Sequence, residues 1–274
     1  MNSDIGESRF PRVAPRLAEA GAVARGLSPR LHGCFALFGL GVSFAVTGGY
    51  STTSIAFETS EYFPLATGDH WEYQVTVTGG STEPVRAGSA TVLDGTIPTR
   101  QVELKGFGES REFYTNDNAG LRLHRFDEGN TQHVFSPPID ILGVQFAEGE
   151  SVSSSGSFGV TFSNGATRGG SYESTARVLP STSVTVPLGT FSAVPVEITI
   201  AESSRIEPFG GILVLTYKRN FWLARHIGPV RRFYVFRAGD QPPITYSGLL
   251  TSVAVDSDGD ERALSVIINF ILSN

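Results

Sequence analysis

The stretch from Tyr62 to Tyr73, Tyr-Phe-Pro-Leu-Ala-Thr-Gly-Asp-His-Trp-Glu-Tyr, decides the interpretation of the whole chain. Pro64 restricts the backbone and Gly68 permits a tight turn, so the first half of the stretch brings the chain to the start of a strand. From Trp71 onward apolar and polar residues alternate, and this period of two places the aromatic side chains on one face of a β-strand. We expect the domain to begin here, with Trp71 and Tyr73 facing its interior.

The same alternation recurs along the rest of the chain. Strand-like runs lie at residues 87–93, 100–107, 110–115, 120–127, 131–135, 152–162, 170–179, 193–202, 211–223, 229–237 and 244–255. Gly, Pro, Asn or Asp separates almost every pair of runs, and no segment of helical period lies between them. The sequence therefore predicts an all-β, mainly antiparallel fold with few short helices, a strongly curved sheet whose strands, with one apolar face, must close or curl.

An apolar leader precedes this domain. Residues 33–46 are uncharged and apolar, they follow Arg30 and His32, and small residues come directly after them. This is the layout of a signal peptide, and the run is shorter than the roughly 20 residues that a membrane-spanning helix needs. We expect a cleavable signal and export to the periplasm or the extracellular space. The alternatives are a retained membrane anchor through residues 33–49 and a buried core helix.

The only cysteine, Cys34, stands at the beginning of the apolar run and not after its end, so it is poorly placed for lipidation. If the leader is cleaved near Gly49, the mature protein has no cysteine at all. It then contains no disulfide and no thiolate metal site, and its stability must come from its core.

The chain divides into four segments. Residues 1–49 form the leader, residues 50–60 a polar tether, residues 61–256 a single β-rich domain, and residues 257–274 an apolar C-terminal tail that we expect to pack on the domain. The tail fits both a helical stripe and a strand, and its β-branched content favours the strand. Between domain and tail, Asp256–Glu261 predicts a polar turn more than a calcium loop, because glycine and glutamate are not at their EF-hand positions.

Charge excludes one class of partner. The net charge is -6, and residues 1–32 hold five arginines against three acidic residues, or +2, which leaves -8 for the remainder. A domain with this charge repels phosphate backbones, so we expect no nucleic-acid partner.

Motifs for catalysis are weak. The sequence has no nucleophile elbow, no dinucleotide fingerprint and no phosphate-binding loop. His124 and His133 are the only pair of histidines that a hairpin could bring together, and no second ligand pair accompanies them. We expect no cofactor, no metal and no enzymatic activity. A glycan-acting hydrolase, whose carboxylates would be distant in sequence, is the least favoured alternative.

A group of arginines interleaves with aromatic residues late in the chain. One hypothesis is a surface basic patch that meets anionic lipid or polysaccharide. The simpler interpretation, which we favour, is an outer sheet face whose arginines pair with neighbouring acids and cover apolar surface with their stems. The arginines of this predicted basic patch are Arg219, Arg225, Arg231, Arg232 and Arg237.

Three segments, taken in order, resemble a widespread group of uncharacterised bacterial exported proteins and lipoproteins. They are the Tyr62–Tyr73 stretch, Val186-Pro187-Leu188-Gly189-Thr190-Phe191 with Ala193, and Trp222-Leu223-Ala224 with Gly228 and Val230. Those proteins look related to the lipoprotein-carrier superfamily of LolA and LolB. The resemblance implies a half-barrel whose curved sheet wraps an apolar groove. This chain differs from the lipidated members because it lacks a usable lipidation site.

Two functions follow from these observations. The leading hypothesis is an exported, non-catalytic protein that holds a lipid or other apolar ligand in the concave face of its sheet, lined by Trp71, Tyr73, Phe221 and Trp222. The competing hypothesis is a structural or interaction module of the cell envelope with a solid core. The volume inside the sheet distinguishes them, because ligand pockets measure several hundred Å³. The sequence does not indicate the oligomeric state.

Overall fold

Alternation of buried and exposed side chains makes β2 (His70–Thr78) the first long strand of the domain. Trp71 and Tyr73 are buried, as are the two valines that follow on the same face, and the intervening side chains are exposed. The two aromatic residues therefore face the interior, as the alternation predicts.

The computed structural model describes residues 56–79, 85–95, 99–108, 110–206 and 211–255. The predicted leader, most of the tether, the Asp256–Glu261 turn and the apolar tail lie outside these residues. Within the described part of the chain, no helix has the length and apolar character needed to cross a bilayer.

The described residues form fifteen strands and one short helix, and they belong to one compact unit. The elements are β1 (Phe57–Glu58), α1 (Thr59–Tyr62), β2 (His70–Thr78), β3 (Val85–Asp94), β4 (Arg100–Lys105), β5 (Ser110–Asp117), β6 (Gly120–Glu128), β7 (Thr131–Leu142), β8 (Gln145–Phe146), β9 (Ser151–Thr161), β10 (Thr167–Val178), β11 (Thr182–Val186), β12 (Gly189–Ile206), β13 (Gly211–Ala224), β14 (Gly228–Ala238) and β15 (Ile244–Ala254). The predicted all-β, mainly antiparallel fold is confirmed.

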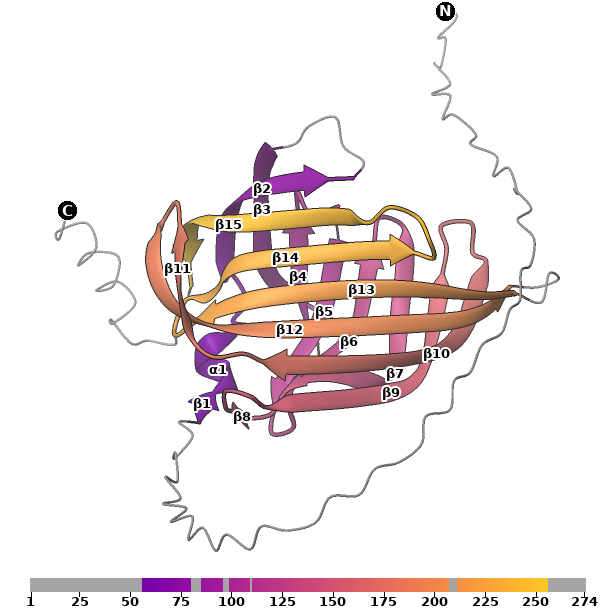
Figure 1. Cartoon of the computed structure of the whole chain (residues 1–274), viewed down its shortest axis with the longest axis horizontal. Helices are drawn as coiled ribbons and strands as arrows, with labels where there is room; N and C mark the ends of the chain where they lie inside the picture. The colour runs from indigo at the N-terminus through magenta and orange to yellow at the C-terminus, as the bar shows by residue number, and fades with distance from the viewer. Residues whose placement is uncertain (1–55, 80–84, 96–98, 109, 207–210, 256–274) are drawn as a thin grey trace, which may run out of the picture. The chain divides into compact units, whose positions relative to one another are not determined.

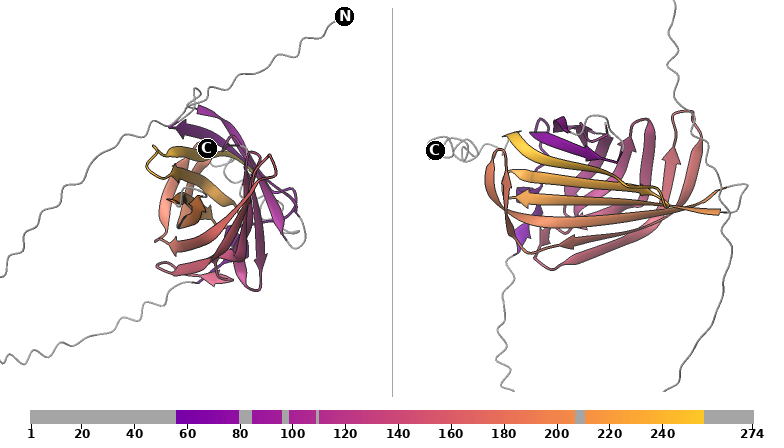
Figure 2. Two further views of the ribbon diagram at one scale, coloured as in Figure 1. Left: turned by 90° about the vertical axis from the view of Figure 1, so that its right-hand side faces the viewer. Right: turned by 45° about the horizontal axis from the view of Figure 1, so that its top comes forward.

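The main sheet closes on itself. Its strand order is β10-β9-β7-β6-β5-β4-β3-β2-β15-β14-β13-β12, and β12 then pairs with β10, from Ser171 opposite Ser203 to Val178 opposite Val196. All the pairings are antiparallel, and β11 adds to the start of β12. The sheet is therefore strongly curved, as predicted, and the pairing of β12 with β10 closes it into a barrel (Figures 1 and 2). Along this pairing neither strand has a free edge.

Helix α1 and the chain around it lie at one end of the barrel (Figure 1). The rings of Phe57, Tyr62 and Phe146 pack together with centroid separations of 5.2 to 5.6 Å. Phe146 belongs to β8, which pairs with β1 in a separate two-stranded sheet. This aromatic cluster fixes α1 in place, and the segment after α1 then turns into β2.

Trp71 joins this end to the β13–β14 turn. Its Nε1–H donates a hydrogen bond to the carbonyl oxygen of Ile227 at 2.6 Å. Gly228, next in the chain, has a φ of +89°, and a Cβ there would lie 3.1 Å from the Trp71 ring and 3.2 Å from Pro64. A side chain at position 228 would therefore be strained by the backbone conformation and would also press on its two neighbours. The sequence elements Pro64, Trp71 and Gly228 meet at one point.

Replacement of Trp71 by phenylalanine tests this junction. The change removes the hydrogen bond to Ile227 and part of the buried ring, so we expect the free energy of unfolding to fall by about 1–3 kcal/mol in urea denaturation. Trp222 provides the control because it is the only other tryptophan, lies half-buried on the outer face and packs under the Arg231 guanidinium at 4.4 Å. Trp222→Phe should change stability by about 0.5 kcal/mol or less. An equal decrease in the free energy of unfolding for the two variants would contradict the role of Trp71 at this junction.

Candidate functional site

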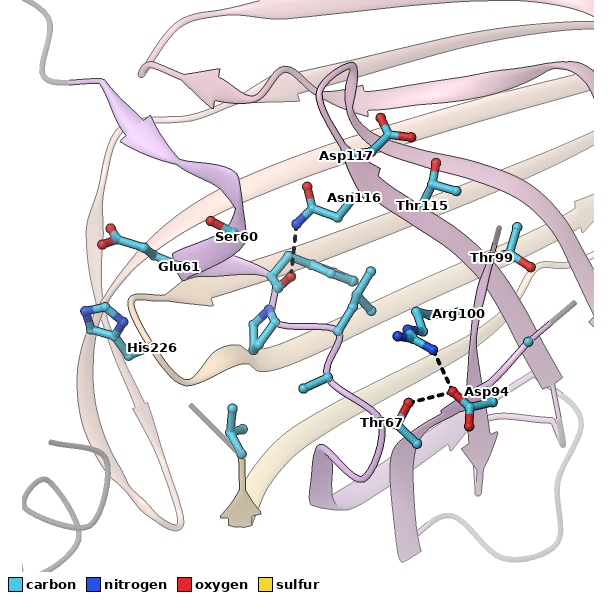
Figure 3. Close-up of a pocket in the computed structure, with 16 residues that line it drawn as sticks. Ser60, Glu61, Thr67, Asp94, Thr99, Arg100, Thr115, Asn116, Asp117 and His226 are labelled. Carbon is cyan, nitrogen blue, oxygen red and sulfur yellow. Dashed lines mark hydrogen bonds and ion pairs between the residues drawn. The ribbon is translucent and has the colours of Figure 1, made fainter. Parts of the chain in front are cut away.

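A groove of about 1220 Å³ lies beside α1 and the segment that enters β2. Figure 3 shows that its polar side chains belong to α1, to the ends of β3 and β5, to the start of β4 and to the β13–β14 turn. Phe63, Pro64, Leu65 and Ala66 give the lining its apolar part. An apolar floor with a polar rim is the usual composition of a recognition surface.

The charged groups of the rim are held by partners. Asp94 accepts hydrogen bonds from Thr67 at 2.8 Å and from Arg100 at 2.6 Å. Glu61 receives both Nε and Nη2 of Arg225 at 2.9 Å, a bidentate pair. The hydrogen bond from Arg225, more than its charge, lowers the pKa of the Glu61 carboxyl. These pairs hold the charged side chains of the rim in place.

A second cluster lies inside the barrel, centred on Glu112 of β5. Its carboxylate accepts a short hydrogen bond from Arg219 of β13 and one of 2.9 Å from the Tyr114 hydroxyl, and Arg232 of β14 lies 3.7 Å away. The three charged side chains are 1 to 7% exposed. One carboxylate thus stands between two guanidinium groups in a site that is almost completely buried.

Aromatic residues complete the shell of this cluster. Arg232 donates from Nε to the Tyr73 hydroxyl at 3.1 Å and from Nη1 to the Tyr234 hydroxyl at 3.0 Å, while Tyr73 donates to the Pro229 carbonyl at 2.7 Å. The Arg219 guanidinium lies 4.6 Å from the centroid of the Phe126 ring. Hydroxyl oxygens and ring faces therefore stabilise the second positive charge, for which Glu112 alone is insufficient.

Burial shifts the ionisation of this shell. Removal from water raises the pKa of Tyr73, Tyr114 and Tyr234 above the ordinary value for tyrosine. Burial is the largest single influence on Arg219 and would lower its pKa, but Glu112, Tyr114 and Tyr234 together outweigh it, and the pKa of this guanidinium is raised. The arginines therefore stay charged and the tyrosines neutral throughout the physiological range.

A further buried pair joins β7 to β12. Nδ1 of His133 lies 3.0 Å from a Glu202 oxygen, and the imidazole stacks on Phe126 with a centroid separation of 4.4 Å and an interplanar angle of 11°. Burial raises the pKa of the neighbouring Glu128 carboxyl. The Tyr217 ring packs on Phe126 at 4.9 Å, so the pair is enclosed by aromatic side chains.

The cavity beside the Glu112 cluster is small. The cavity bordered by Glu112, Glu128, Tyr217, Arg219 and Tyr234 has a volume of about 50 Å³. That is room for one or two water molecules, against the roughly 300–1,000 Å³ of a ligand pocket. Side chains fill most of the space around this cluster.

The four predicted ligand-lining residues do not share one surface. Trp71, Tyr73 and Phe221 are buried, at 1%, 2% and 0% exposure, and each packs against protein. Trp222 follows Phe221 on β13 and so points to the opposite face, where Arg231 covers its ring. Their role in binding a ligand stays a prediction.

The predicted basic patch is divided between the two faces of the sheet. Arg219 and Arg232 are 5% and 1% exposed and lie inside the barrel, so including them in a surface patch was wrong. Arg225 is exposed in the β13–β14 turn, and Arg231 and Arg237 lie on the outer face. The strand period could have revealed this difference, because Arg219 shares its face with the buried Phe221 two residues later.

The predicted histidine pair has separate partners. His133 pairs with Glu202, whereas Nε2 of His124 lies 3.0 Å from the Thr115 hydroxyl. A register irregularity between Leu123 and Arg125 interrupts the ladder at His124. Among the described residues, no group of three or more histidine, cysteine or acidic side chains has an arrangement that could hold a metal ion.

No protein-family model matches the sequence, and a search of curated proteins finds no match. Similar solved structures include the following three. A predicted lipoprotein of Parabacteroides distasonis has 14% identity, a TM-score of 0.34 and coverage of 70% of this chain and 97% of that one. The hypothetical lipoprotein YmcC of Escherichia coli has 10% identity, a TM-score of 0.36 and coverage of 68% and 89%. A predicted exported protein of Bacteroides fragilis with a YmcC-like fold has 12% identity, a TM-score of 0.31 and coverage of 70% and 98%. TM-scores this low carry no functional conclusion, and the resemblance to LolA and LolB stays a prediction.

The interior cluster makes a stability prediction. Glu112→Gln removes the only carboxylate between two buried guanidinium groups, so the free energy of unfolding should fall by about 3–5 kcal/mol. The matched control is Asp94→Asn at the rim, where the side chains of the Arg100–Asp94 pair are 47% and 74% exposed. An exposed pair of this kind contributes about 0–1 kcal/mol. If both variants lose the same small amount in urea denaturation, the cluster is not the buried element described above.

Buried tyrosines predict a loss of stability at alkaline pH. The pKa of Tyr73, Tyr114, Tyr217 and Tyr234 is raised by burial in the folded protein, whereas an unfolded chain ionises its tyrosines near pH 10. Below pH 10 or so, these tyrosines are neutral in both states and their full contribution to stability is present. Above it the unfolded state releases more protons, and stability falls by up to about 1.4 kcal/mol per pH unit for each tyrosine.

Denaturation at about pH 8 to 11, with tyrosinate absorbance as the second signal, measures this effect. Lysine adds little, because the sequence holds only Lys105 and Lys218. Tyr217→Phe should reduce the slope. Constant stability across the range, or ionisation of these tyrosines before unfolding, would show that the interior is open to water.

Proposed function

We propose that this chain is an exported, non-catalytic β-domain of the bacterial cell envelope that acts through its outer surface as an interaction module. One observation carries the proposal: the cavity beside the buried Glu112–Arg219 pair is about 50 Å³, too small for a lipid or acyl chain. The apolar leader at residues 33–46 supports export. Of the two functions that the sequence leaves open, this volume favours the module with a solid core.

Contacts across the barrel support the same conclusion. Strands β5 and β13 are six positions apart in either direction around the ring of twelve, so they form opposite walls. Glu112 and Arg219 nevertheless form a direct ion pair. An acyl chain between these walls would break that pair and leave buried charges without partners, at a cost of several kcal/mol. The interior carboxylates are both paired, Glu112 with Arg219 and Glu202 with His133, which supports a structural role for them.

The groove beside α1 is the surface that we assign to recognition. It is larger than the interior cavity, and its floor includes the apolar side chains of Pro64, Leu65 and Ala66. Asn116 supplies a polar group above that floor, and its Nδ2 lies 3.5 Å from the Phe63 carbonyl oxygen (Figure 3). A surface of this shape suits an extended segment of another envelope protein, which offers both apolar side chains and backbone hydrogen bonds.

Native mass spectrometry of the protein purified without detergent tests the solid interior. We expect the mass of the polypeptide alone, and no transfer of a fluorescent fatty acid into the protein. Recombinant protein from an unrelated host and protein from its own cells should behave alike. A co-purified lipid at near-stoichiometric occupancy, released only on unfolding, would contradict the proposal and restore the ligand-binding hypothesis.

A further inference from the structure

The groove beside α1 is bordered by the last residue that the structure describes. Val255 lines the groove together with the apolar floor at residues 64–66. Strand β15 runs antiparallel to β2, and Ala254 lies opposite His70 at the start of β2. The floor comes just before His70 in the sequence, so the chain leaves β15 beside the floor. The residues that follow Val255 therefore start at the groove.

Two runs of different composition follow Val255, and both lie outside the described residues. Residues 256–262, here called the acidic link, hold four carboxylates and one arginine. Residues 263–272, here called the apolar segment, read Ala-Leu-Ser-Val-Ile-Ile-Asn-Phe-Ile-Leu and have no charge. Connections of about 4–6 residues commonly join neighbouring elements, so the link is long enough to bring the apolar segment back over the groove. An uncovered apolar run of this length favours aggregation, so it needs a surface that covers it.

The groove suits a segment of this composition. Its floor at residues 64–66 is only half-buried and keeps apolar surface that an occupant can cover. Each carboxylate of its rim already has an arginine partner, and a segment without charge leaves these pairs intact. An acidic segment would meet the rim carboxylates, and a basic one would compete with the arginines. The rim pairs are Glu61–Arg225, Asp94–Arg100 and Asp117–Arg122.

The apolar segment presents one apolar side in either regular conformation. Leu264, Ile268 and Leu272 are spaced by four residues, a spacing that places side chains on the same face of a strand and of a helix. The apolar floor can therefore be covered whichever form the segment takes.

Attachment to the same chain favours the apolar segment over other occupants. A short flexible link holds a tethered segment at an effective concentration of about 1 mM, far above that of a free partner or of a second copy in dilute solution. The other uncharged apolar run, residues 33–46, belongs to the leader that we expect to be removed on export. Charge, position and concentration thus select the same occupant.

We propose that the apolar segment docks in the groove beside α1 of its own chain, with Leu264, Ile268 and Leu272 against the apolar floor. The docked segment covers the surface to which we assign recognition, so a segment of another envelope protein binds there only by displacing it. In this regulatory role the inference rests on the proposed function, whereas the docking itself does not.

Chemical cross-linking tests the docking in the full chain. Cys34→Ser removes the only native cysteine, and Ser60→Cys with Ser265→Cys then places one thiol on the groove and one on the apolar segment. Ser163→Cys replaces Ser60→Cys in the matched control, because Ser163 is also an exposed serine and lies in the β9–β10 turn away from α1 (Figure 1). In dilute protein, a short bismaleimide should join positions 60 and 265 within one chain about 10-fold faster, or more, than positions 163 and 265.

A dye at position 60 provides a second readout. An environment-sensitive dye on Ser60→Cys should emit as in an apolar medium while the segment is docked. Ile268→Asp places a charge against the apolar floor, so it should lower the ratio of docked to free segment by about 10- to 100-fold and shift the emission toward that in water. Leu37→Asp, the equivalent change in the apolar leader, should leave the emission unchanged.

Four results would overturn the proposal. Equal cross-linking from positions 60 and 163 would show that the apolar segment has no preference for the groove. Cross-links that form only between two chains, in a mixture of the single-cysteine variants, would assign the groove to a second copy. Emission that Ile268→Asp leaves unchanged would remove the segment from the groove, and emission that Leu37→Asp shifts instead would assign the groove to the leader. None of these results bears on the interior, which native mass spectrometry tests separately, so failure of the docking and failure of the proposed function are distinguishable.

Discussion

The ion pair between Glu112 and Arg219 joins opposite walls of the barrel, and the arrangement of the interior depends on it. A ring of twelve strands could enclose a wide space if it were circular. This ring brings β5 and β13 close enough for two charged side chains to touch. Because a buried charge without a partner is costly, every other group near the pair has to supply a hydrogen bond or a ring face.

Several features follow from that constraint. Tyr73, Tyr114 and Tyr234 place their hydroxyl groups within the cluster, which is why tyrosine and not phenylalanine occupies these interior positions. Aromatic rings such as Phe126 and Tyr217 fill the space beside it and enclose a second buried pair. The barrel interior is consequently both polar and full. The close packing around these pairs supports our proposal that recognition takes place outside, at the groove beside α1.

The strand pattern of the sequence was sufficient for the fold class and for the direction of Trp71 and Tyr73, because alternation reports which face of a strand is buried. It also contained, unused, the information that Arg219 is internal, since Phe221 and Tyr217 share its face. The partner of Arg219 was beyond prediction from one sequence: Glu112 lies 107 residues away, and only closure of the ring brings the two together. Closure itself depends on the pairing of β12 with β10, and the strand runs do not specify which strands pair. The groove likewise combines loops from several elements, so no local motif marks it.

Whether the interior of this barrel is solid is decided most directly by a high-resolution crystal structure of the protein isolated from its own cells. The account predicts that the space between Glu112, Tyr217 and Tyr234 contains one or two water molecules and that the Glu112–Arg219 pair is intact. Elongated density of an acyl chain between β5 and β13, with Arg219 turned away from Glu112, would contradict it.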